Sequence, residues 1–397
     1  MTSTWVPIPE DSGFGADNLP YGVFSRAGQA PRVGVRIGDH VLDLAGALGD
    51  ELFDAASLNP FMACGRSAWT ATRERVQQLL SDPAQRPATE PHLVPLDQVT
   101  LHLPVEVADY VDYYCSIEHA SNIGRMFRPD QEPLKPNWRH LPVGYHGRAG
   151  TVVPSGTPVV RPNGLRKPAD APEPVYGPST RLDIEAEVGF VVGAGSTLGD
   201  AVNIGDFREH VFGVVLLNDW SARDIQAFEY VPLGPYLGKS FATSISPWVT
   251  PLDALEGARA PGRPQHPEPT SYLQRKEPWG LDLTLQVELN GEVLSHPPYA
   301  GMYWTADQML AHMAVNGASL RTGDLYASGT VSGEVQEERG SLIEISWNGA
   351  EPIKLPDGTT RTFLEDGDTV TLAATAPGPG GSQISLGEVT GTIRPAP

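Results

Sequence analysis

The alternation of apolar and polar residues near the N-terminus predicts short strands. Residues 21–44, YGVFSRAGQAPRVGVRIGDHVLDL, alternate over three stretches that glycine-containing turns separate, and this is the pattern of half-buried strands. A helical period replaces it over residues 66–81 and stops before Asp82-Pro83, a pair that commonly ends a helix. We therefore expect a small β-barrel and then one helix.

Residues 83–95, PAQRPATEPHLVP, contain few apolar side chains and several prolines. This composition is typical of a domain boundary or an inter-domain strap. We therefore expect an N-terminal domain with its linker over residues 1–95 and a C-terminal domain over residues 96–397. Alternation over residues 99–103 predicts a strand at the start of the second domain.

The C-terminal half carries the signals of an antiparallel sheet. Two-residue turns that need positive φ join hairpin strands, and Asn-Gly and Asp-Gly suit them. Three such dipeptides lie between strand-like runs: Asn290-Gly291, Asn348-Gly349 and Asp366-Gly367. One helix interrupts the sheet, because Thr305 can cap residues 306–315 and Asn316-Gly317 can end them.

Composition narrows the class of protein. A chain of 397 residues exceeds the roughly 250–300 residues at which a single core stops growing. We therefore expect one large domain and a smaller one. With 42 glycines and 38 prolines, turns and short strands should outnumber long helices, so we expect a mainly β protein of α+β type.

Charge and cysteine content bear on partners and compartment. The net charge of −20 opposes binding to nucleic acid or to an anionic membrane, and no apolar run approaches the roughly 18 residues of a membrane helix. Cys64 and Cys115 are too few for a disulfide framework, and the first residues lack a secretion signal. We expect a cytoplasmic protein.

Paired carboxylates mark the strand-like run 182–193, LDIEAEVGFVVG. Alternation places Asp183, Glu185 and Glu187 opposite the apolar face, with Glu185 and Glu187 side by side. Hard oxygen ligands of this kind suit Mg²⁺, Ca²⁺ or Mn²⁺. The other interpretation is the solvated face of an amphipathic strand, and this run alone does not decide between them.

Two further carboxylates follow strand-like runs. Asp219 ends VFGVVLLND and either caps the next helix or binds a metal ion, while Asp112 lies in DYVDYYCS. Together with the Glu-x-Glu pair, these residues can form a cage of oxygen ligands. Spacing along the chain does not show that the four side chains converge.

A histidine and a distant glutamate form a second candidate. His119 lies on the apolar side of a predicted helix, SIEHASNIGRMFR, where a buried core histidine is the alternative interpretation. In SLIEISW, alternation directs Glu344 away from Ile343 and Ile345. A carboxylate of this kind can orient an imidazole, and the pair would activate water.

The segment SARDIQAFEYVPLGPYLGKSFATSISPW places polar donors among glycines and prolines that fix the backbone, as stabilisation of an oxyanion requires. Alternatively, Arg223 pairs with Asp224 or Glu229 on a solvated helix. No P-loop, GxGxxG turn or GxSxG elbow is present, so we expect no organic cofactor and no serine triad. The polar donors of the segment SARDIQAFEYVPLGPYLGKSFATSISPW are Arg223, Gln226, Tyr230, Lys239 and Thr243.

Long motifs resemble the fumarylacetoacetate hydrolase family over essentially the whole chain: DYVDYYCSIEHASNIGRMFR, PNWRHLPVGYHGRAG, LDIEAEVGFVVG, NDWSARDIQAFEYVPLGPYLGKSFATSISPW and ASGTVSG. The resemblance implies an N-terminal SH3-like barrel, a larger C-terminal β-sandwich roll and a homodimer. It also implies a metal-dependent hydrolase that cleaves a carbon-carbon bond of a diketo acid, fumarylacetoacetate, in tyrosine and phenylalanine catabolism.

The resemblance also implies roles for individual residues. A divalent cation, Ca²⁺ or Mg²⁺, would be held by Asp112, Glu185, Glu187 and Asp219, with Lys239 and Thr243 beside a second, Mg²⁺-type position. His119 would be the general base, oriented by Glu344, and the oxyanion would be stabilised by Arg223, Gln226 and Lys239. The substrate would contact Tyr114, Arg128, Tyr145, Gln226, Tyr230 and Thr330.

One of the few departures from the family lies beside the proposed base, and two alternatives stay open. Glu118 stands where the family's mammalian form has glutamine, and it would raise the basicity of His119 if it faced the pocket. Related acylpyruvate hydrolases and decarboxylases use a similar acidic set but typically lack the N-terminal barrel. A Ca²⁺-dependent carbohydrate-binding β-sandwich is disfavoured by the His119 and Glu344 pair and by the lack of a secretion signal.

Overall fold

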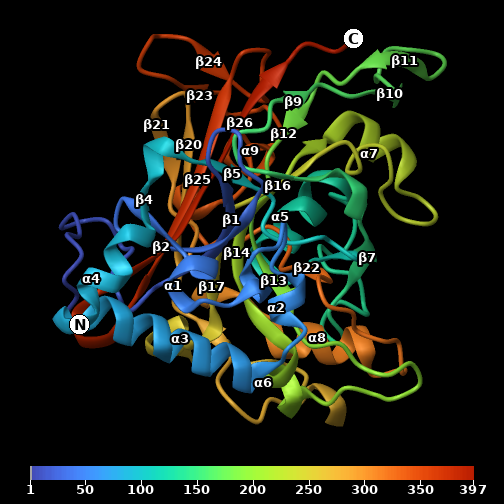
Figure 1. Ribbon diagram of the computed structural model, residues 1–397. Coiled ribbons are helices and arrows are strands. Elements are labelled where there is room, and N and C mark those ends of the chain that lie inside the picture. The colour runs from blue at the N-terminus through green and yellow to red at the C-terminus, as the bar shows by residue number, and fades with distance from the viewer. Residues whose placement is uncertain (1) are drawn as a thin grey trace.

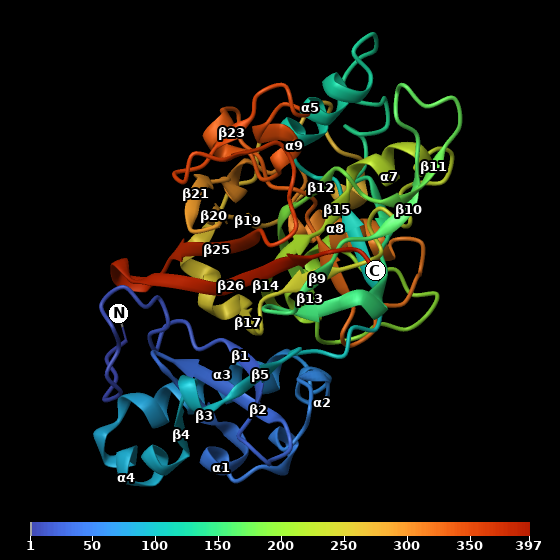
Figure 2. The same cartoon turned by 90° about the horizontal axis from the view of Figure 1, so that it is seen from above.

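The computed structural model describes residues 2–397 as a mixed α/β molecule built mostly from strands (Figure 1). Figure 2 shows the N-terminal elements, in blue, on one side of the remaining chain. A sheet of 13 strands runs through both parts. Its main path is β4 (Leu93–Pro95), β3 (His40–Asp43), β2 (Arg32–Ile37), β1 (Tyr21–Ser25), β17 (Trp248–Pro251), β14 (Val211–Asp219), β13 (Ala186–Val192), β22 (Leu325–Ala327), β6 (Tyr110–Tyr113) and β7 (Gly144–His146).

The N-terminal part confirms the predicted strands and helix. Strands β1 to β3 pair in sequence order, and α3 spans Arg66–Ser81 with Asp82 at its C-cap. Because β1 also pairs with β17, the small sheet continues into the large one. The predicted strand near residue 101 is β5 (Thr100–His102), which pairs with β1.

Residues 83–95, predicted from their composition to be a domain boundary or an inter-domain strap, contain regular structure. They form short helical turns, including α4 (Arg86–Thr89), and then β4, which pairs with β3. Prolines occupy the first turns of these helical segments, where a missing N–H costs nothing. The division of the chain at residues 95 and 96 stays a prediction.

Two antiparallel strands form the centre of the molecule. Every residue of β13 and β14 is buried, as expected for apolar runs covered on both faces. Their register pairs Ala186 with Asn218, and β22 joins β13 to β6 by a parallel pairing of Ala327 with Asp112. Three strands therefore bring their carboxylate-bearing segments to one place.

A second sheet orders β21 (Glu292–Ser295), β20 (Thr284–Leu289), β25 (Thr369–Pro377), β26 (Gln383–Arg394) and β9 (Val159–Val160). It confirms one predicted hairpin, since Asn290 and Gly291 have φ of 53° and 86° and join β20 to β21.

The other two predicted hairpins are wrong. SLIEISW forms the short helix α9 (Leu342–Ile345) in place of a strand, and Asn348-Gly349 make a local turn after it. Asp366-Gly367 lie between β24 (Thr360–Arg361) and β25, which pair with other strands. Turn-forming dipeptides predict the bend, whereas tertiary packing decides which strands pair.

Three helices carry residues of the site: α5 (Ile117–Phe127), α7 (Arg223–Glu229) and α9. The helix predicted over residues 306–315 is α8 (Ala306–Ala314). The predicted cap of α8 is confirmed, because Thr305 and Gln308 form a capping box.

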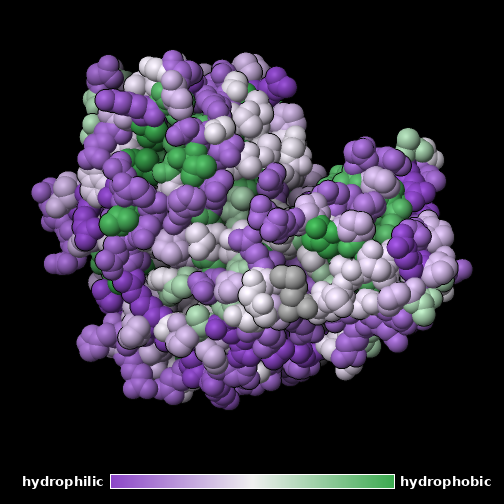
Figure 3. Space-filling model, turned by 90° about the vertical axis from the view of Figure 1, so that its left-hand side faces the viewer, coloured by the Kyte–Doolittle hydropathy of each residue, from purple (hydrophilic) through white to green (hydrophobic). Residues whose placement is uncertain are grey.

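Within residues 2–397, no helix has both the length and the apolar character required to cross a membrane. The face in Figure 3 is mainly hydrophilic, with small apolar patches between polar side chains.

Packing of the central strands should dominate the stability of the second part. We expect Leu216→Ala on β14, whose side chain is 0% exposed, to lower the free energy of unfolding by about 2 to 5 kcal/mol because it leaves a cavity. The control Leu198→Ala, at a position 78% exposed, should change it by less than about 0.5 kcal/mol. Urea unfolding measures both, and equal effects would contradict the assignment of the core.

Candidate metal centre and active site

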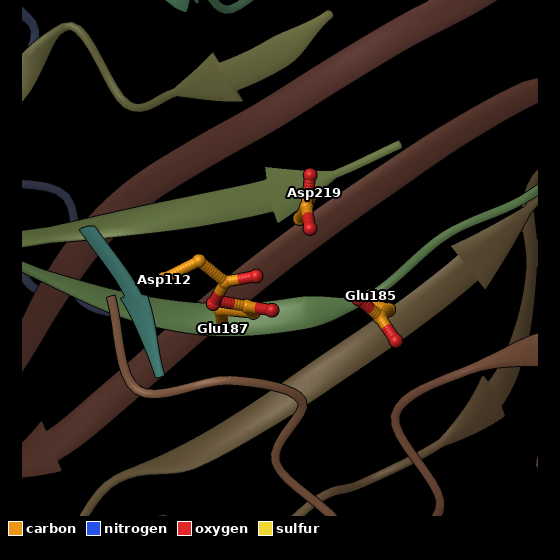
Figure 4. A group of neighbouring side chains, drawn as sticks. All are labelled: Asp112, Glu185, Glu187 and Asp219. Carbon is orange, nitrogen blue, oxygen red and sulfur yellow. The ribbon is translucent and has the colours of Figure 1, made fainter. Parts of the chain in front are cut away.

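Four buried carboxylates converge at the ends of the central strands. Asp112 lies on β6, Glu187 on β13 and Asp219 at the end of β14, while Glu185 precedes β13. One oxygen of each lies within 4.8 Å of one oxygen of every other. In Figure 4, Asp112 and Glu187 point toward one another. Because all four are buried, the solvated-face interpretation of the Glu-x-Glu strand is wrong.

Two cations partly balance this charge. The Lys239 ammonium contacts Glu185 Oε2 and Asp219 Oδ2, and Arg223 Nη2 lies 2.8 Å from Glu185 Oε1. Burial by itself would raise the pKa of Glu185. The charges of Arg223 and Lys239 outweigh burial and hold this pKa well below its ordinary range. Burial and the neighbouring Asp219 instead raise the pKa of Asp112, so part of the negative charge is uncompensated.

The donor set fits a hard divalent cation. Asp112 Oδ1 and Glu187 Oε1 are buried and have no hydrogen-bond partner among the described residues, which is costly unless something else binds them. Carboxylate oxygens are the ligands that Ca²⁺ and Mg²⁺ prefer. Thr243 lies opposite Asp219 in the register of β14 and β16 (Thr243–Ile245); within residues 2–397 its hydroxyl makes no hydrogen bond to the four carboxylates.

A His–Glu pair lies beside the acidic cluster. Ser116 caps α5 by accepting the N–H of His119, which fixes the start of the helix. His119 Nδ1 is 2.6 Å from Glu344 Oε2, and His119 Nε2 is 3.4 Å from Glu185 Oε1. Glu344 also accepts hydrogen bonds from Asn122 and from Ser332 and Ser341, so its orientation is fixed.

The predicted contact is therefore present although the predicted element was wrong. Glu344 reaches His119 from helix α9 and not from a strand. His119 is buried and has a polar partner, as the alternative of a core histidine also expects, but it lines a cavity beside the acidic cluster. Although burial lowers the pKa of His119, the charges of Glu344 and Glu185 raise it to about 9, and His119 in turn lowers the pKa of Glu344 against the effect of burial.

A cavity of about 420 Å³ connects the cluster to the segments around it. Most of the predicted site residues line it: Asp112, Tyr114, His119, Arg128, Tyr145, Glu185, Arg223, Gln226, Tyr230, Lys239 and Thr330. Apolar side chains such as Ile123 and Phe127 form another part of its wall. The cavity wall does not include the remaining predicted residues, Glu187, Asp219, Thr243 and Glu344.

Two alternatives from the sequence are resolved by these contacts. Arg223 pairs with Asp183 and Glu185, and not with Asp224 or Glu229 as a solvated helix would require. Glu118 contacts Arg263 and is not part of the cavity wall. It therefore does not face the pocket beside His119.

Asp183 is the residue that the sequence interpretation missed. Alternation had placed it on the same side as Glu185, but it received no role. It is 0% exposed, pairs with Arg223 Nε at 2.8 Å and accepts backbone N–H groups of α9. Its partners lie 40 and about 160 residues away in the chain, so local sequence patterns could not predict these contacts. The available signal was that Asp183 is a third acidic residue on the polar side of the same strand.

Fold and site together define a mainly β protein with a candidate divalent-cation centre beside a His–Glu pair. The model described as fumarylacetoacetate (FAA) hydrolase C-terminal matches residues 109–394, and the model described as fumarylacetoacetase N-terminal matches residues 17–104. The chain is 47% identical to the fumarylacetoacetase of Homo sapiens over 415 residues, covering 99% of each chain. It is 43% identical to that of Arabidopsis thaliana over 424 residues, covering 100% of this chain and 99% of the relative.

The chain belongs to the fumarylacetoacetate hydrolase family. Solved structures show the same fold at low identity. A fumarylacetoacetate hydrolase from Exiguobacterium antarcticum has a TM-score of 0.57 at 17% identity, covering 95% of this chain and 99% of that one. A maleylpyruvate hydrolase from Sphingobium sp. SYK-6 has a TM-score of 0.53 at 17% identity, covering 95% and 100%.

Metal-free protein should lose stability as the pH rises. Burial and repulsion hold the pKa of Asp112 and Glu187 well above their ordinary values of 3.8 and 4.5. The folded chain thus keeps protons that the unfolded chain releases, and the free energy of unfolding falls above those values. A cation requires ionised ligands, so its binding strengthens over the same range.

We therefore expect the difference in Tm between Ca²⁺- or Mg²⁺-saturated and chelator-treated protein to grow from about pH 5 to about pH 8. Thermal melts followed by circular dichroism measure it. In the Asp112→Asn/Glu187→Gln double variant this difference should shrink at every pH. A difference that is constant with pH, or unchanged in the double variant, would rule out these carboxylates as the ligands.

Proposed function

We propose that the chain hydrolyses the carbon-carbon bond of 4-fumarylacetoacetate, a 1,3-diketo acid, to fumarate and acetoacetate. The observation that carries this proposal is the His119–Glu344 pair beside four convergent carboxylates in one cavity. Full-length relatives named fumarylacetoacetase, 43% to 47% identical, support the same substrate. This reaction is the last step of tyrosine and phenylalanine breakdown.

The proposed metal ligands are Asp112, Glu185, Glu187 and Asp219. Ca²⁺ or Mg²⁺ held by these residues would supply Lewis-acid chemistry, which would polarise carbonyl oxygen and stabilise the carbanion that C–C cleavage creates. Lys239 and Thr243 are proposed neighbours of a second, Mg²⁺-type position. Mn²⁺ has the same ligand preference and is a further candidate.

The proposed general base is His119. The lowered pKa of Glu344 favours its ionised form, to which the imidazole would donate its Nδ1–H. His119 Nε2, 3.4 Å from Glu185 Oε1, would then accept a proton from water. His119 acts as a base only when neutral, and positive charge at the acidic cluster favours the neutral form by offsetting Glu185. The resulting hydroxide attacks the carbonyl carbon next to the fumaryl group.

Attack forms a C–O bond and places a negative charge on the former carbonyl oxygen. Arg223, Gln226 and Lys239 line the cavity and are proposed to stabilise this oxyanion by donating hydrogen bonds. When the oxyanion collapses, the C–C bond breaks and its electron pair leaves with the acetoacetate carbon. The proton held on His119 Nε2 is then available to that carbon, so atoms and charges balance.

The proposed substrate contacts are Tyr114, Arg128, Tyr145, Gln226, Tyr230 and Thr330, all on the cavity wall. Arg128 Nε and Thr330 Oγ1 are buried without a hydrogen-bond partner among the described residues. Unsatisfied donors of this kind suit the carboxylate and carbonyl oxygens of a dicarboxylic diketone. The SH3-like closure of the N-terminal strands, the β-sandwich roll and the homodimer stay predictions from the resemblance.

A substrate panel tests the proposed function. We expect the metal-loaded protein to hydrolyse fumarylacetoacetate with a kcat/KM at least about 100-fold above that for acylpyruvates with a single carboxylate, because the second carboxylate can pair with the Arg128 guanidinium on the cavity wall. Loss of the diketone ultraviolet absorbance follows each reaction. Faster turnover of an acylpyruvate would favour the related hydrolases, and decarboxylation without hydrolysis would favour the related decarboxylases.

The base assignment makes a separate prediction. His119→Ala should lower kcat by about 10²- to 10⁴-fold, as expected for the loss of general-base catalysis, with a native circular dichroism spectrum. Glu118→Gln is the matched control on the same helix turn, because Glu118 contacts Arg263 outside the cavity, and its kcat should stay within about twofold of the parent. Near-normal turnover by folded His119→Ala would exclude His119 as the base.

A further inference from the structure

Asp183 is a buried carboxylate that the reaction proposed above does not use. It ends β12 (Leu182–Asp183), two residues before Glu185, and is 0% exposed. Its contacts join two parts of the site that are far apart in the sequence. Resting on the proposed function, we propose that Asp183 is a positioning residue, which holds Glu344 and Arg223 in one fixed arrangement around the cavity.

The first part is helix α9, which carries Glu344. Asp183 Oδ1 accepts the N–H of Leu342 at 2.8 Å, and Asp183 Oδ2 accepts the N–H of Ile343 at 3.2 Å. A helix of four residues is not stable by itself, so tertiary contacts decide where it lies. Since Glu344 follows directly, the Asp183 carboxylate fixes the position from which Glu344 reaches His119.

The second part is Arg223 at the start of α7. Asp183 Oδ2 accepts a hydrogen bond from Arg223 Nε at 2.8 Å, while Arg223 Nη2 lies 2.8 Å from Glu185 Oε1. A planar guanidinium held by carboxylates at two edges has one orientation. Without Asp183, only Glu185 would balance its charge in this contact, and Arg223 would draw Glu185 away from the other three carboxylates.

A buried ion pair with a purely structural role would affect stability alone, and the chain contains a matched example. Asp368 is 3% exposed, accepts the N–H of Glu365 at 2.8 Å and a hydrogen bond from Arg361 Nε at 2.9 Å. Like Asp183, Asp368 thus joins a backbone N–H to an arginine Nε, and it also accepts from Arg361 Nη2 and Asn290 Nδ2. Asp368 lies outside the cavity wall. It therefore separates a positioning role from the general cost of breaking such a pair.

The kinetic test compares Asp183→Asn with Asp368→Asn in the full-length, metal-loaded protein. Both substitutions should lower Tm. Asp183→Asn should also lower kcat by about 10- to 100-fold, as loss of outer hydrogen-bond partners does at metal sites, with KM changed less than about threefold. Asp368→Asn should leave kcat within about twofold of the parent. Equal kcat values for the two variants would overturn the proposal.

A second readout does not depend on the substrate. With ¹⁵N-labelled histidine, the resonance of the His119 Nδ1–H donated to Glu344 should move or broaden in Asp183→Asn and stay unchanged in Asp368→Asn. If the parent fails to hydrolyse fumarylacetoacetate, the proposed function is wrong, but this resonance still tests the positioning role. An unchanged resonance in Asp183→Asn would overturn it.

Asp183→Glu covers the case in which Asp183→Asn does not fold. It keeps the charge that Arg223 requires but moves the carboxylate by one methylene, so kcat should again fall by at least about tenfold. Parent-like kcat in folded Asp183→Glu would overturn the proposal. Failure of both variants to fold would overturn it too, because Asp183 would then be required by the fold itself.

Discussion

Repulsion among four buried carboxylates is the constraint on which the rest of this structure depends. Their oxygens approach within 4.8 Å of one another, and none is exposed to solvent enough to be screened. Removing a charged group from water costs several kcal/mol per ion unless it is paired. Lys239 and Arg223 supply part of the compensation, and the charge that they leave unbalanced is what makes the site suited to a divalent cation.

The fold supplies the rigidity that such a cluster needs. β13 and β14 are buried along their whole length, and β22 ties β13 to β6, so three carboxylates are carried by strands that cannot move apart easily. Around this frame, short helices carry the groups that must be oriented: α5 holds His119 and α9 holds Glu344. Rigid strands thus carry three of the proposed ligands, and the helices place the proposed base beside them.

The sequence predicted the individual elements well where local patterns decide them. Helix α3, strands β1 to β3 and the cap of α8 follow from periodicity and capping residues. It failed where distant partners decide: SLIEISW alternates like a strand, yet it is helical and its first N–H groups bond to Asp183. The acidic residues were visible in the motifs, but their convergence depends on pairings between strands more than 100 residues apart.

The central claim is that one divalent ion sits among Asp112, Glu185, Glu187 and Asp219. Anomalous diffraction from crystals of the full-length protein soaked in Mn²⁺ tests it most directly. The account predicts one strong anomalous peak per chain, within coordination distance of an oxygen from each of the four side chains. A peak elsewhere, or occupied sites that leave any two of these carboxylates without contact to the ion, would contradict it.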